Sequence, residues 1–281
     1  MDIYAEITDR IIAELEQGII PWQKPWTGSS NSAVSHMTGK PYSLLNQMLL
    51  GRPGEYVTFN QCKQLGGMVR KGEKSKMIVF WKWLEKEEVT DSGEKKVASI
   101  PFLKYYNVFH IDQCDGIEPK HAKENGENLI EVQPDAVADA IMDSYIQRSG
   151  VVFRNEQGDR AYYRPSEDSI TLPLFSQFAD VAEYYSTAFH EAVHSTGHQN
   201  RLNRLDATAH FGNEEYSKEE LVAEIGAAAL VNVAGLESMD SFKNNVAYIQ
   251  SWLKALRNDK KLIVSAAGRA DKAVALILSN E

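Results

Sequence analysis

The apolar positions at the start of the chain follow a helical repeat. Every fourth residue from Ile3 to Leu15 is aliphatic, which places these side chains along one face of a helix. Gly18 and Pro21 follow, and they end a helix because glycine favours the left-handed cap and proline cannot continue the helical hydrogen bonding. The sequence predicts a helix over residues 3–17.

The pattern then changes to short runs that glycine, proline and asparagine interrupt. Segments 55–59, 76–84 and 95–111 are rich in β-branched and aromatic residues, which is typical of strands. The segments 44–50 and 59–67 predict helices between these strands. The first part of the chain is therefore expected to form a small α+β domain.

The stretch 118–135 is polar, contains proline and glycine, and has no periodicity, so we predict a linker there. Strands come first after it and helices later, an order typical of α+β folds. The expected elements are a helix at 134–150, strands at 151–155, 161–165 and 168–173, and helices at 178–196, 218–234, 243–257 and 268–278. The predicted fold class is α+β with two domains, residues 1–125 and residues 131–281.

Composition narrows the class of protein. The chain has 281 residues, of which 43% are hydrophobic, enough for one large or two ordinary globular domains. No apolar run reaches the roughly 20 residues that a membrane-spanning helix needs, and the acidic, amphipathic start lacks the features of a secretory signal. We expect no membrane partner and a cytoplasmic location. Cys62 and Cys114 are the only cysteines, and their spacing indicates free thiols rather than a zinc site.

The segment HEAVH at residues 190–194 is the first candidate for chemistry. Residues four apart lie on the same face of a helix, so His190 and His194 can bind one metal ion. Glu191 lies one step round the helix, close enough to take a proton from a water molecule on that metal. Because Zn²⁺ lowers the pKa of such a water toward about 7, this arrangement suits peptide hydrolysis. We expect Zn²⁺, or another divalent metal, at this site.

A third ligand is expected on the helix at 218–234. Glu220 and Glu224 lie one turn apart on one face, so one could bind the metal while the other orients a ligand histidine. The sequence leaves open which of the two binds directly. The small residues around Gly226 would let this helix approach the histidine helix closely. An exposed acidic stripe, together with a histidine pair that simply packs in the core, is the alternative interpretation.

Two neighbouring features are assigned supporting roles. His198 lies two turns beyond His190, about 12 Å along a straight helix, which is too far for the same ion, so we expect it to be structural. Gly197 is expected to end the helix before it.

A peptide substrate could add itself to the sheet along the segment 168–173, if that strand lies at an exposed edge.

Basic residues interleaved with aromatic ones indicate a binding site for single-stranded nucleic acid, because cations follow phosphates while rings stack on unpaired bases. The net charge is −9, but seven basic and only two acidic residues lie between Arg52 and Lys82. The candidate DNA-binding residues are Trp22, Lys24, Trp26, Arg70, Lys71, Lys74, Lys76 and Trp81. The alternative is that Ile78, Phe80 and Trp83 form the buried face of a strand.

Several long motifs in this order resemble the ArdC-type antirestriction family of plasmids and mobile elements. They include IIPWQKPW, YVTFNQCKQLGGMVRKGEKSKMIVFWKW, YYSTAFHEAVHSTGHQNRL and YSKEELVAEIGAAAL. The resemblance implies an N-terminal domain that binds single-stranded DNA and a C-terminal zincin-like metallopeptidase domain. It also implies protection of DNA that enters a cell as a single strand during conjugation. His190 and His194 match the metal ligands of the family, Glu191 its catalytic residue, and the EELVAE segment its acidic ligand.

Three hypotheses follow. The first is a DNA-binding zinc metallopeptidase with Glu191 as general base, acting on an unknown protein substrate for which a host restriction component is a candidate. The second is a non-enzymatic single-stranded DNA-binding protein whose metal only joins two helices. The third is a peptidase without a role in DNA binding.

Overall fold

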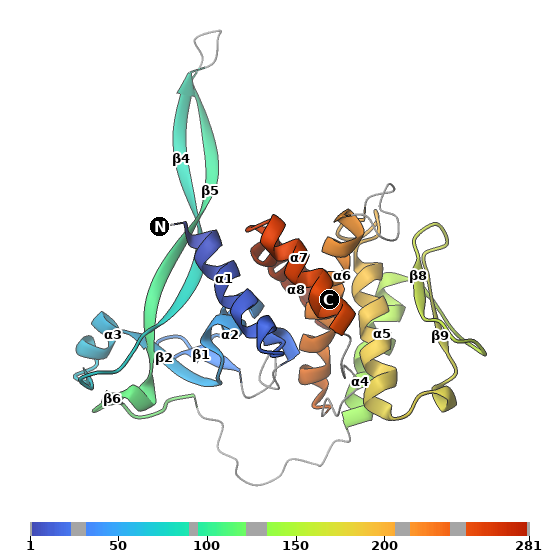
Figure 1. The fold of residues 1–281 in the computed structure, drawn as a ribbon, viewed down its shortest axis with the longest axis horizontal. Coiled ribbons are helices and arrows are strands. Elements are labelled where there is room, and N and C mark those ends of the chain that lie inside the picture. The colour runs from blue at the N-terminus through green and yellow to red at the C-terminus, as the bar shows by residue number, and fades with distance from the viewer. Residues whose placement is uncertain are drawn as a thin grey trace.

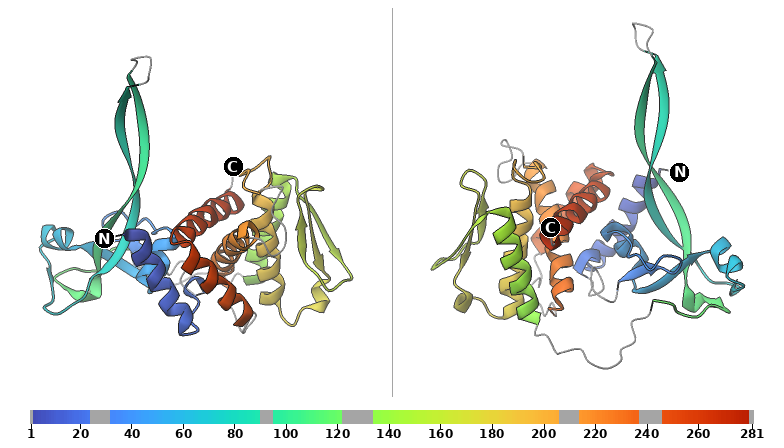
Figure 2. Two further views of the ribbon diagram at one scale, coloured as in Figure 1. Left: turned by 45° about the horizontal axis from the view of Figure 1, so that its top comes forward. Right: turned by 180° about the vertical axis from the view of Figure 1, so that it is seen from behind.

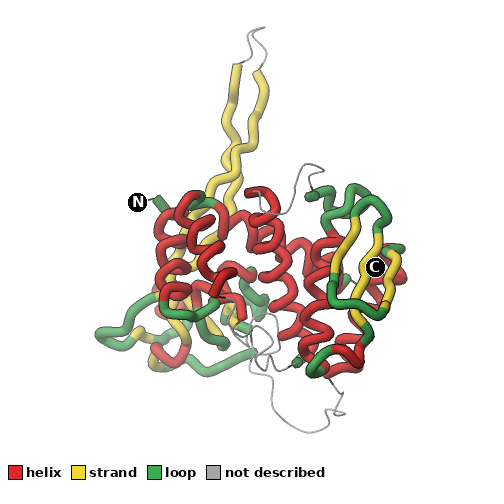
Figure 3. Tube along the Cα trace, turned by 45° about the vertical axis from the view of Figure 1, so that its right-hand side comes forward, coloured by secondary structure: helices red, strands yellow, loops and turns green. Residues whose placement is uncertain are grey.

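The computed structural model describes residues 2–23, 32–89, 95–121, 134–205, 214–236 and 246–279. Its helices gather between two separate groups of strands (Figure 3), so the predicted α+β class is confirmed. None of the helices within these ranges is long and apolar enough to cross a membrane.

The first half of the chain is built around a four-stranded sheet of order β1-β2-β5-β4. The strands β4 and β5 pair antiparallel from Lys76 opposite Val108 to Val89 opposite Lys95, and the far part of this hairpin stands out from the body (Figure 1). The elements are α1 (Ile3–Glu16), η1 (Pro21–Gln23), β1 (Ala33–Ser35), α2 (Leu44–Leu50), β2 (Gly54–Thr58), α3 (Phe59–Gln64), β3 (Met68–Val69), β4 (Lys76–Val89), β5 (Lys95–His110), η2 (Ile111–Gln113) and β6 (Cys114–Asp115).

The second half places a three-stranded sheet beside a helical bundle. Its elements are α4 (Pro134–Ser149), β7 (Val152–Glu156), β8 (Tyr162–Arg164), β9 (Ser169–Pro173), η3 (Phe175–Gln177), α5 (Val181–Thr196), α6 (Glu214–Ala234), α7 (Val246–Asn258) and α8 (Leu262–Leu278). The predicted helices and strands are all present. Helix α8 begins six residues earlier than expected, because Leu262 and Ile263 are buried in the core and this burial outweighs the cost of about 1 kcal/mol for Gly268 inside a helix.

One expectation about the sheet is wrong. The strand order is β7-β9-β8, so β9, which contains the segment 168–173, is the central strand. Strand β9 pairs parallel with β7 and antiparallel with β8, and its apolar side chains Ile170 and Leu172 are fully buried. Both backbone edges of β9 are therefore occupied, and it cannot receive a peptide. The edges of this sheet are β7 and β8.

Helices from both ends of the chain share one hydrophobic core. Ile7, Ile11 and Leu15 of α1 belong to the same buried cluster as Leu256 of α7 and the apolar face of α8, and these helices lie side by side in two views (Figures 1 and 2). A division into residues 1–125 and 131–281 stays a prediction. Its boundary falls within residues 122–133, outside the described residues.

A half-buried carboxylate also ties the two halves together. The Oδ1 atom of Asp271 on α8 accepts a hydrogen bond of 3.0 Å from the backbone N–H of Leu44, at the first turn of α2. Burial raises the pKa of Asp271 to about 6. A carboxylate at a helix N-terminus satisfies an otherwise unpaired amide and interacts favourably with the helix dipole.

Helices α5 and α6 pack closely because α6 carries glycine where they meet. A Cβ atom on Gly226 would lie 2.8 Å from the Cγ2 atom of Val193 on α5, a distance that real side chains do not tolerate. Val193, Ala223 and Ala227 are fully buried around this contact. The predicted close approach of the two helices is therefore confirmed, and it brings the carboxylates of α6 to the histidines of α5.

Candidate functional site

The histidine helix has defined ends. Asp180 caps the start of α5, with its Oδ1 atom accepting a hydrogen bond of 2.8 Å from the N–H of Glu183. Gly197 ends the helix as predicted. A Cβ atom at Gly197 would lie 2.7 Å from the Cγ atom of Leu205, so a larger residue there would collide with this side chain of the returning chain. Helix α5 therefore holds its histidines on a rigid, buried element.

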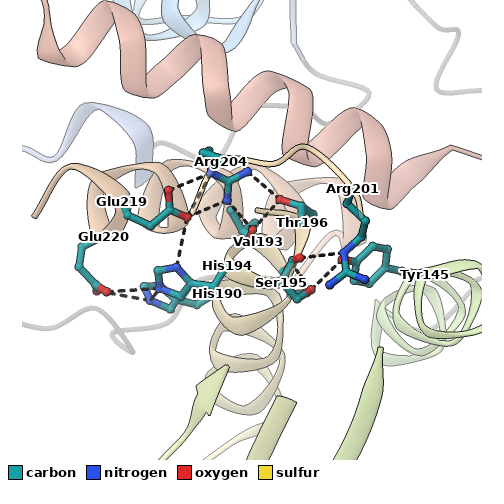
Figure 4. A network of polar contacts seen from close by, with 11 residues as sticks. Tyr145, His190, Val193, His194, Ser195, Thr196, Arg201, Arg204, Glu219 and Glu220 are labelled. Atoms are coloured by element: carbon teal, nitrogen blue, oxygen red, sulfur yellow. Dashed lines mark hydrogen bonds and ion pairs between the residues drawn. The ribbon is translucent and has the colours of Figure 1, made fainter. Parts of the chain in front are cut away.

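His190, His194 and Glu220 form a compact group of ligand atoms (Figure 4). The Nε2 atoms of the two histidines are 3.1 Å apart. Glu220 places its Oε1 atom 3.3 Å from Nε2 of His194 and its Oε2 atom 3.6 Å from Nε2 of His190. All three side chains are only partly exposed, at 13–19%. One ligand atom from each of the three residues thus lies within 4.8 Å of the other two, at the surface of the α5–α6 pair.

These separations fit a small divalent cation. Four ligands in a tetrahedron with bonds of about 2.0–2.2 Å stand about 3.3–3.6 Å from one another. The two histidine nitrogens are 3.1 Å apart, and each lies 3.3 or 3.6 Å from one of the two Glu220 oxygens, which is a similar spacing. Two imidazole nitrogens and one carboxylate oxygen are a donor set found in catalytic zinc sites, where the fourth position is left for water. The residues present therefore fit a metal ion without rearrangement of the backbone.

Glu224, the other candidate ligand, lies behind His190. Its Oε1 atom is 3.8 Å from Nδ1 of His190, the ring nitrogen that points away from the group of ligand atoms. Its Oε2 atom is buried and has no hydrogen-bond partner among the described residues. Burial raises the pKa of Glu224, and the negative charge of Glu220 adds to the effect. Glu224 thus contacts His190 from outside the ligand group.

The corresponding neighbour of His194 is Glu219, which the sequence reasoning missed. The Oε1 atom of Glu219 lies 3.4 Å from Nδ1 of His194. Arg204 holds this carboxylate through hydrogen bonds of 2.7, 2.8 and 3.2 Å and also donates to the hydroxyl of Thr196 and the carbonyl of Val193 (Figure 4). A carboxylate that fixes the second nitrogen of a ligand histidine sets its tautomer and orientation.

The charges of the site favour a cation. Burial alone would lower the pKa of His194, but the carboxylates of Glu219 and Glu220 outweigh it and raise that pKa to about 10. Burial would likewise raise the pKa of Glu220, but the two histidines hold it well below its ordinary value. The same negative potential that would protonate His194 would attract a divalent ion, which displaces protons from its ligands.

The other histidine-helix residues occupy distinct places. Glu191 is buried, at 8% exposure, and its negative charge helps raise the pKa of both His190 and His194. It therefore lies close to the ligand group without belonging to it. His198 is outside the group, since its Nδ1 atom lies 3.8 Å from Asp168.

The base of the hairpin presents two aromatic rings and a lysine on one face. Phe80 and Tyr106 are 45% and 39% exposed, and their ring centroids lie 5.9 Å apart. The Nζ atom of Lys104 is 5.2 Å from the centre of the Tyr106 ring. The alternative that Phe80 belongs to a buried strand face is therefore wrong, although Ile78 on the same face is buried. We call Phe80, Tyr106 and Lys104 the hairpin face.

The predicted DNA-binding residues have different surroundings. Lys71, Lys74 and Lys76 are exposed, and Trp81 is 50% exposed. Arg70 is exposed but forms ion pairs of 3.2 Å with Glu73 and 3.5 Å with Asp115, so part of its charge is neutralised.

The prediction for Trp22 is wrong. Its side chain is completely buried and packs edge-on against Trp252 at a centroid distance of 5.1 Å, so its ring is a core contact that cannot stack on a base. Lys24 and Trp26 lie outside the described residues.

Comparisons with known proteins identify the family to which the two halves of the chain belong. A family model described as the N-terminal domain of anti-restriction factor ArdC matches residues 1–109, and one described as a zincin-like metallopeptidase matches residues 140–269. The Mn(II)-bound crystal structure of the antirestriction ArdC protein from plasmid R388 superposes with a TM-score of 0.76 and 36% identity, over 99% of this chain and 97% of that one. The chain belongs to the ArdC family of antirestriction proteins. The metal-free crystal structure of the R388 ArdC protein superposes on this chain with a TM-score of 0.74 at 38% identity, with the same coverage of both chains.

ArdC-like sequence also occurs inside longer proteins. The chain is 35% identical to a DNA primase TraC of Escherichia coli across 99% of this chain, but it spans only 27% of that primase. It is 32% identical to the uncharacterised protein y4eC of Sinorhizobium fredii (strain NBRC 101917 / NGR234), over 96% of this chain and 90% of that protein. The Mn(II)-bound ArdC structure and the zincin-like domain imply a divalent metal for this chain, and the group of His190, His194 and Glu220 is a candidate site for it.

Proposed function

We propose that this ArdC-family chain is a single-stranded DNA-binding zinc metallopeptidase, and that it protects DNA entering a recipient's cytoplasm by conjugation. The observation that carries the enzymatic part is the group of His190, His194 and Glu220. The two Nε2 atoms are 3.1 Å apart, and each lies within 3.6 Å of an oxygen of Glu220. In this proposal these three residues bind the metal directly. Glu224 and Glu219 orient His190 and His194 from outside.

The metal, when bound, would lower the pKa of a water molecule toward about 7 and polarise the peptide carbonyl. Glu191 then acts as general base, accepting a proton from that water as its oxygen bonds to the carbonyl carbon. Glu191 delivers the same proton to the peptide nitrogen as the C–N bond breaks, so it ends each cycle deprotonated. Its position beside the histidines and its low exposure of 8% support this role. A component of a host restriction system is the candidate substrate.

The hairpin face and the exposed lysines at positions 71, 74 and 76 support the DNA-binding part of the proposal. Phe80 and Tyr106 offer rings on which unpaired bases could stack, and each stacked base contributes about 1–3 kcal/mol. The lysines would follow the phosphates of the strand. Such binding would bring the peptidase to its target on the incoming DNA.

Glu191→Gln tests the catalytic assignment. The variant keeps the size of the side chain and all three proposed ligands, so it should bind Zn²⁺ with unchanged stoichiometry while cleavage of fluorescein-labelled casein, or of a protein in a recipient-cell lysate, falls by a factor of about 100 or more. Asp143→Asn, which removes an exposed carboxylate on α4, serves as the control and should retain full activity. If Glu191→Gln cleaved as fast as the original chain, Glu191 would not be the base.

A second candidate function is single-stranded DNA binding with a structural metal. The observation in its favour is that the three proposed ligands come from α5 and α6, so that a metal would join two packed helices. In that case chelation would lower the melting temperature, no protein would be cleaved, and protection of DNA would survive Glu191→Gln.

A further inference from the structure

A cavity of about 460 Å³ lies where the hairpin meets the helices of the second half. It is on the opposite side of α6 from the metal ligands, since its α6 residues are Lys218 and Val222 whereas the ligand carboxylate is Glu220. Tyr4 from α1, Trp81 from β4, and the segment from Asp259 to Arg269 complete the lining. This volume lies within the range of about 300–1,000 Å³ that small-molecule sites occupy.

The charged side chains around the cavity are mostly basic. Lys218 on α6, Lys261 at the N-cap of α8 and Arg269 on α8 bring three positive charges, and Asp259 is the acidic residue among the lining. Asp259 is engaged locally, because its Oδ1 atom accepts a hydrogen bond of 2.8 Å from the backbone N–H of Lys261. A cavity with this balance of charge favours an anion, in a chain whose net charge is −9.

Two aromatic rings accompany these cations. Trp81 is 50% exposed, so a large part of its ring is available to a ligand. The Nζ atom of Lys261 stands 5.6 Å from the centre of the Tyr4 ring. A planar ring beside a group of cations is what a nucleotide requires, with the base stacked on the ring and the phosphate held by the cations.

Strand β4 connects this cavity to the hairpin face. Side chains alternate along a strand, so Trp81 points to the same side as Val79, which enters the core shared with the helices. Phe80 points to the opposite side and belongs to the hairpin face. The basic residue Lys76 begins β4, and five residues of strand, about 17 Å, separate it from Trp81. A bound strand of DNA that passes the exposed edge of β4 could therefore reach both faces.

We propose that this cavity binds one nucleotide of single-stranded DNA, with the base on Trp81 and the phosphate between Lys261 and Arg269. The inference rests on the DNA-binding part of the proposed function and deepens it. The binding surface then includes helices of the zincin-like half as well as the hairpin, and the bound strand lies across the junction between the two halves.

The test uses the full chain and a fluorescein-labelled dT20 oligonucleotide, with binding followed by anisotropy at several salt concentrations. Trp81→Ala should weaken binding at least about fivefold, the lower bound for loss of one stacked base, and Trp81→Phe should restore most of the affinity. The pair Lys261→Gln and Arg269→Gln should reduce the slope of log K against log salt by about 0.7, for the loss of one neutralised phosphate. Lys254→Gln, which removes an exposed charge on α7, should change neither quantity. Melting temperatures verify that each variant is folded.

The outcomes separate this inference from the function on which it rests. If the original chain does not bind dT20, or binds it without salt dependence, the proposed DNA-binding function itself fails. If the original chain binds dT20, and Phe80→Ala weakens binding while folded cavity variants bind as tightly as the original with the same salt slope, the inference about the cavity is overturned and the proposed function stands.

Discussion

Glu219 offers a sharp test of how the metal site is held. Its carboxylate binds Arg204 through three hydrogen bonds of 2.7–3.2 Å and lies 3.4 Å from Nδ1 of His194. Glu219→Gln keeps the shape of the side chain but replaces the charged partner of His194 by a neutral amide, which fixes the orientation of the imidazole less strongly. Loss of such a partner lowers metal affinity about 10- to 100-fold, or about 1.4–2.7 kcal/mol.

Glu219→Ala should also destabilise the fold. Arg204 is only 6% exposed, so removal of its carboxylate leaves a buried positive charge, which costs about 3–5 kcal/mol. Arg204 keeps its hydrogen bonds to Thr196 and to the carbonyl of Val193, and we therefore expect the lower end of that range.

Two measurements check these values, a calorimetric Mn²⁺ titration for affinity and urea unfolding in a chelator for stability. Glu167→Gln is the control, since Glu167 forms an exposed ion pair with Arg164 and should leave both quantities unchanged. Mn²⁺ affinity that is the same in the original chain and in both Glu219 variants would refute the idea that Glu219 positions His194.

Three further predictions concern packing, pH and DNA. Gly226→Val should destabilise the fold by about 1–3 kcal/mol in urea unfolding, because its side chain would overlap Val193; unchanged stability would contradict the close packing of α5 and α6. The pKa of Asp271 is raised from 3.8 to about 6 by burial, so the folded chain binds more protons than the unfolded chain between these values, and stability is lost as pH rises through about 6. Asp271→Asn keeps an acceptor for the α2 amide. The variant should be more stable than the original chain at pH 7 by about 1–3 kcal/mol, and this difference should vanish near pH 4. Equal stability of the two chains at both pH values would show that the carboxylate is not buried. Phe80→Ala should weaken dT20 binding about 5- to 150-fold without lowering the melting temperature. Trp22→Ala should lower the melting temperature, because Trp22 is a core residue. The opposite pattern would reverse these two assignments.

The sequence predicted the proximity of His190 and His194 well because it depends on local geometry. Residues four apart on a helix must share a face, so His190 and His194 could be paired without knowledge of the fold. Glu220 was recognised from its place one turn before Glu224, but the two carboxylates could not be ranked. Their roles depend on the rotation of α6 against α5, which the contact between Gly226 and Val193 sets.

Glu219 was missed for a related reason. It lies next to Glu220 in the sequence, and a pattern that pairs residues one turn apart leaves it out. Its partner Arg204 comes from the loop after α5, fifteen residues earlier. The sequence offered one signal for Glu219, the presence of the cationic residue Arg204, because a carboxylate that is buried beside the histidine helix needs a positive partner. The sequence does not show that these two residues meet, because their contact depends on the tertiary fold.

The aromatic residues were the least predictable. Trp22 follows a helix end and lies close to Lys24 in the sequence. This local composition is as typical of a nucleic-acid-binding surface as of a core contact. The structure buries it against Trp252, a residue 230 positions away in the sequence. Phe80 is exposed although its neighbour on the same strand face, Ile78, is buried, because the hairpin leaves the body of the protein at that point.

Anomalous diffraction from crystals soaked with Zn²⁺ tests the central claim most directly. The account predicts one strong peak at the zinc edge, about 2.0–2.2 Å from Nε2 of His190, Nε2 of His194 and one oxygen of Glu220, with Glu224 outside the ligand set. A peak held by other residues, or the absence of a peak between the two histidines in fully soaked crystals, would contradict it.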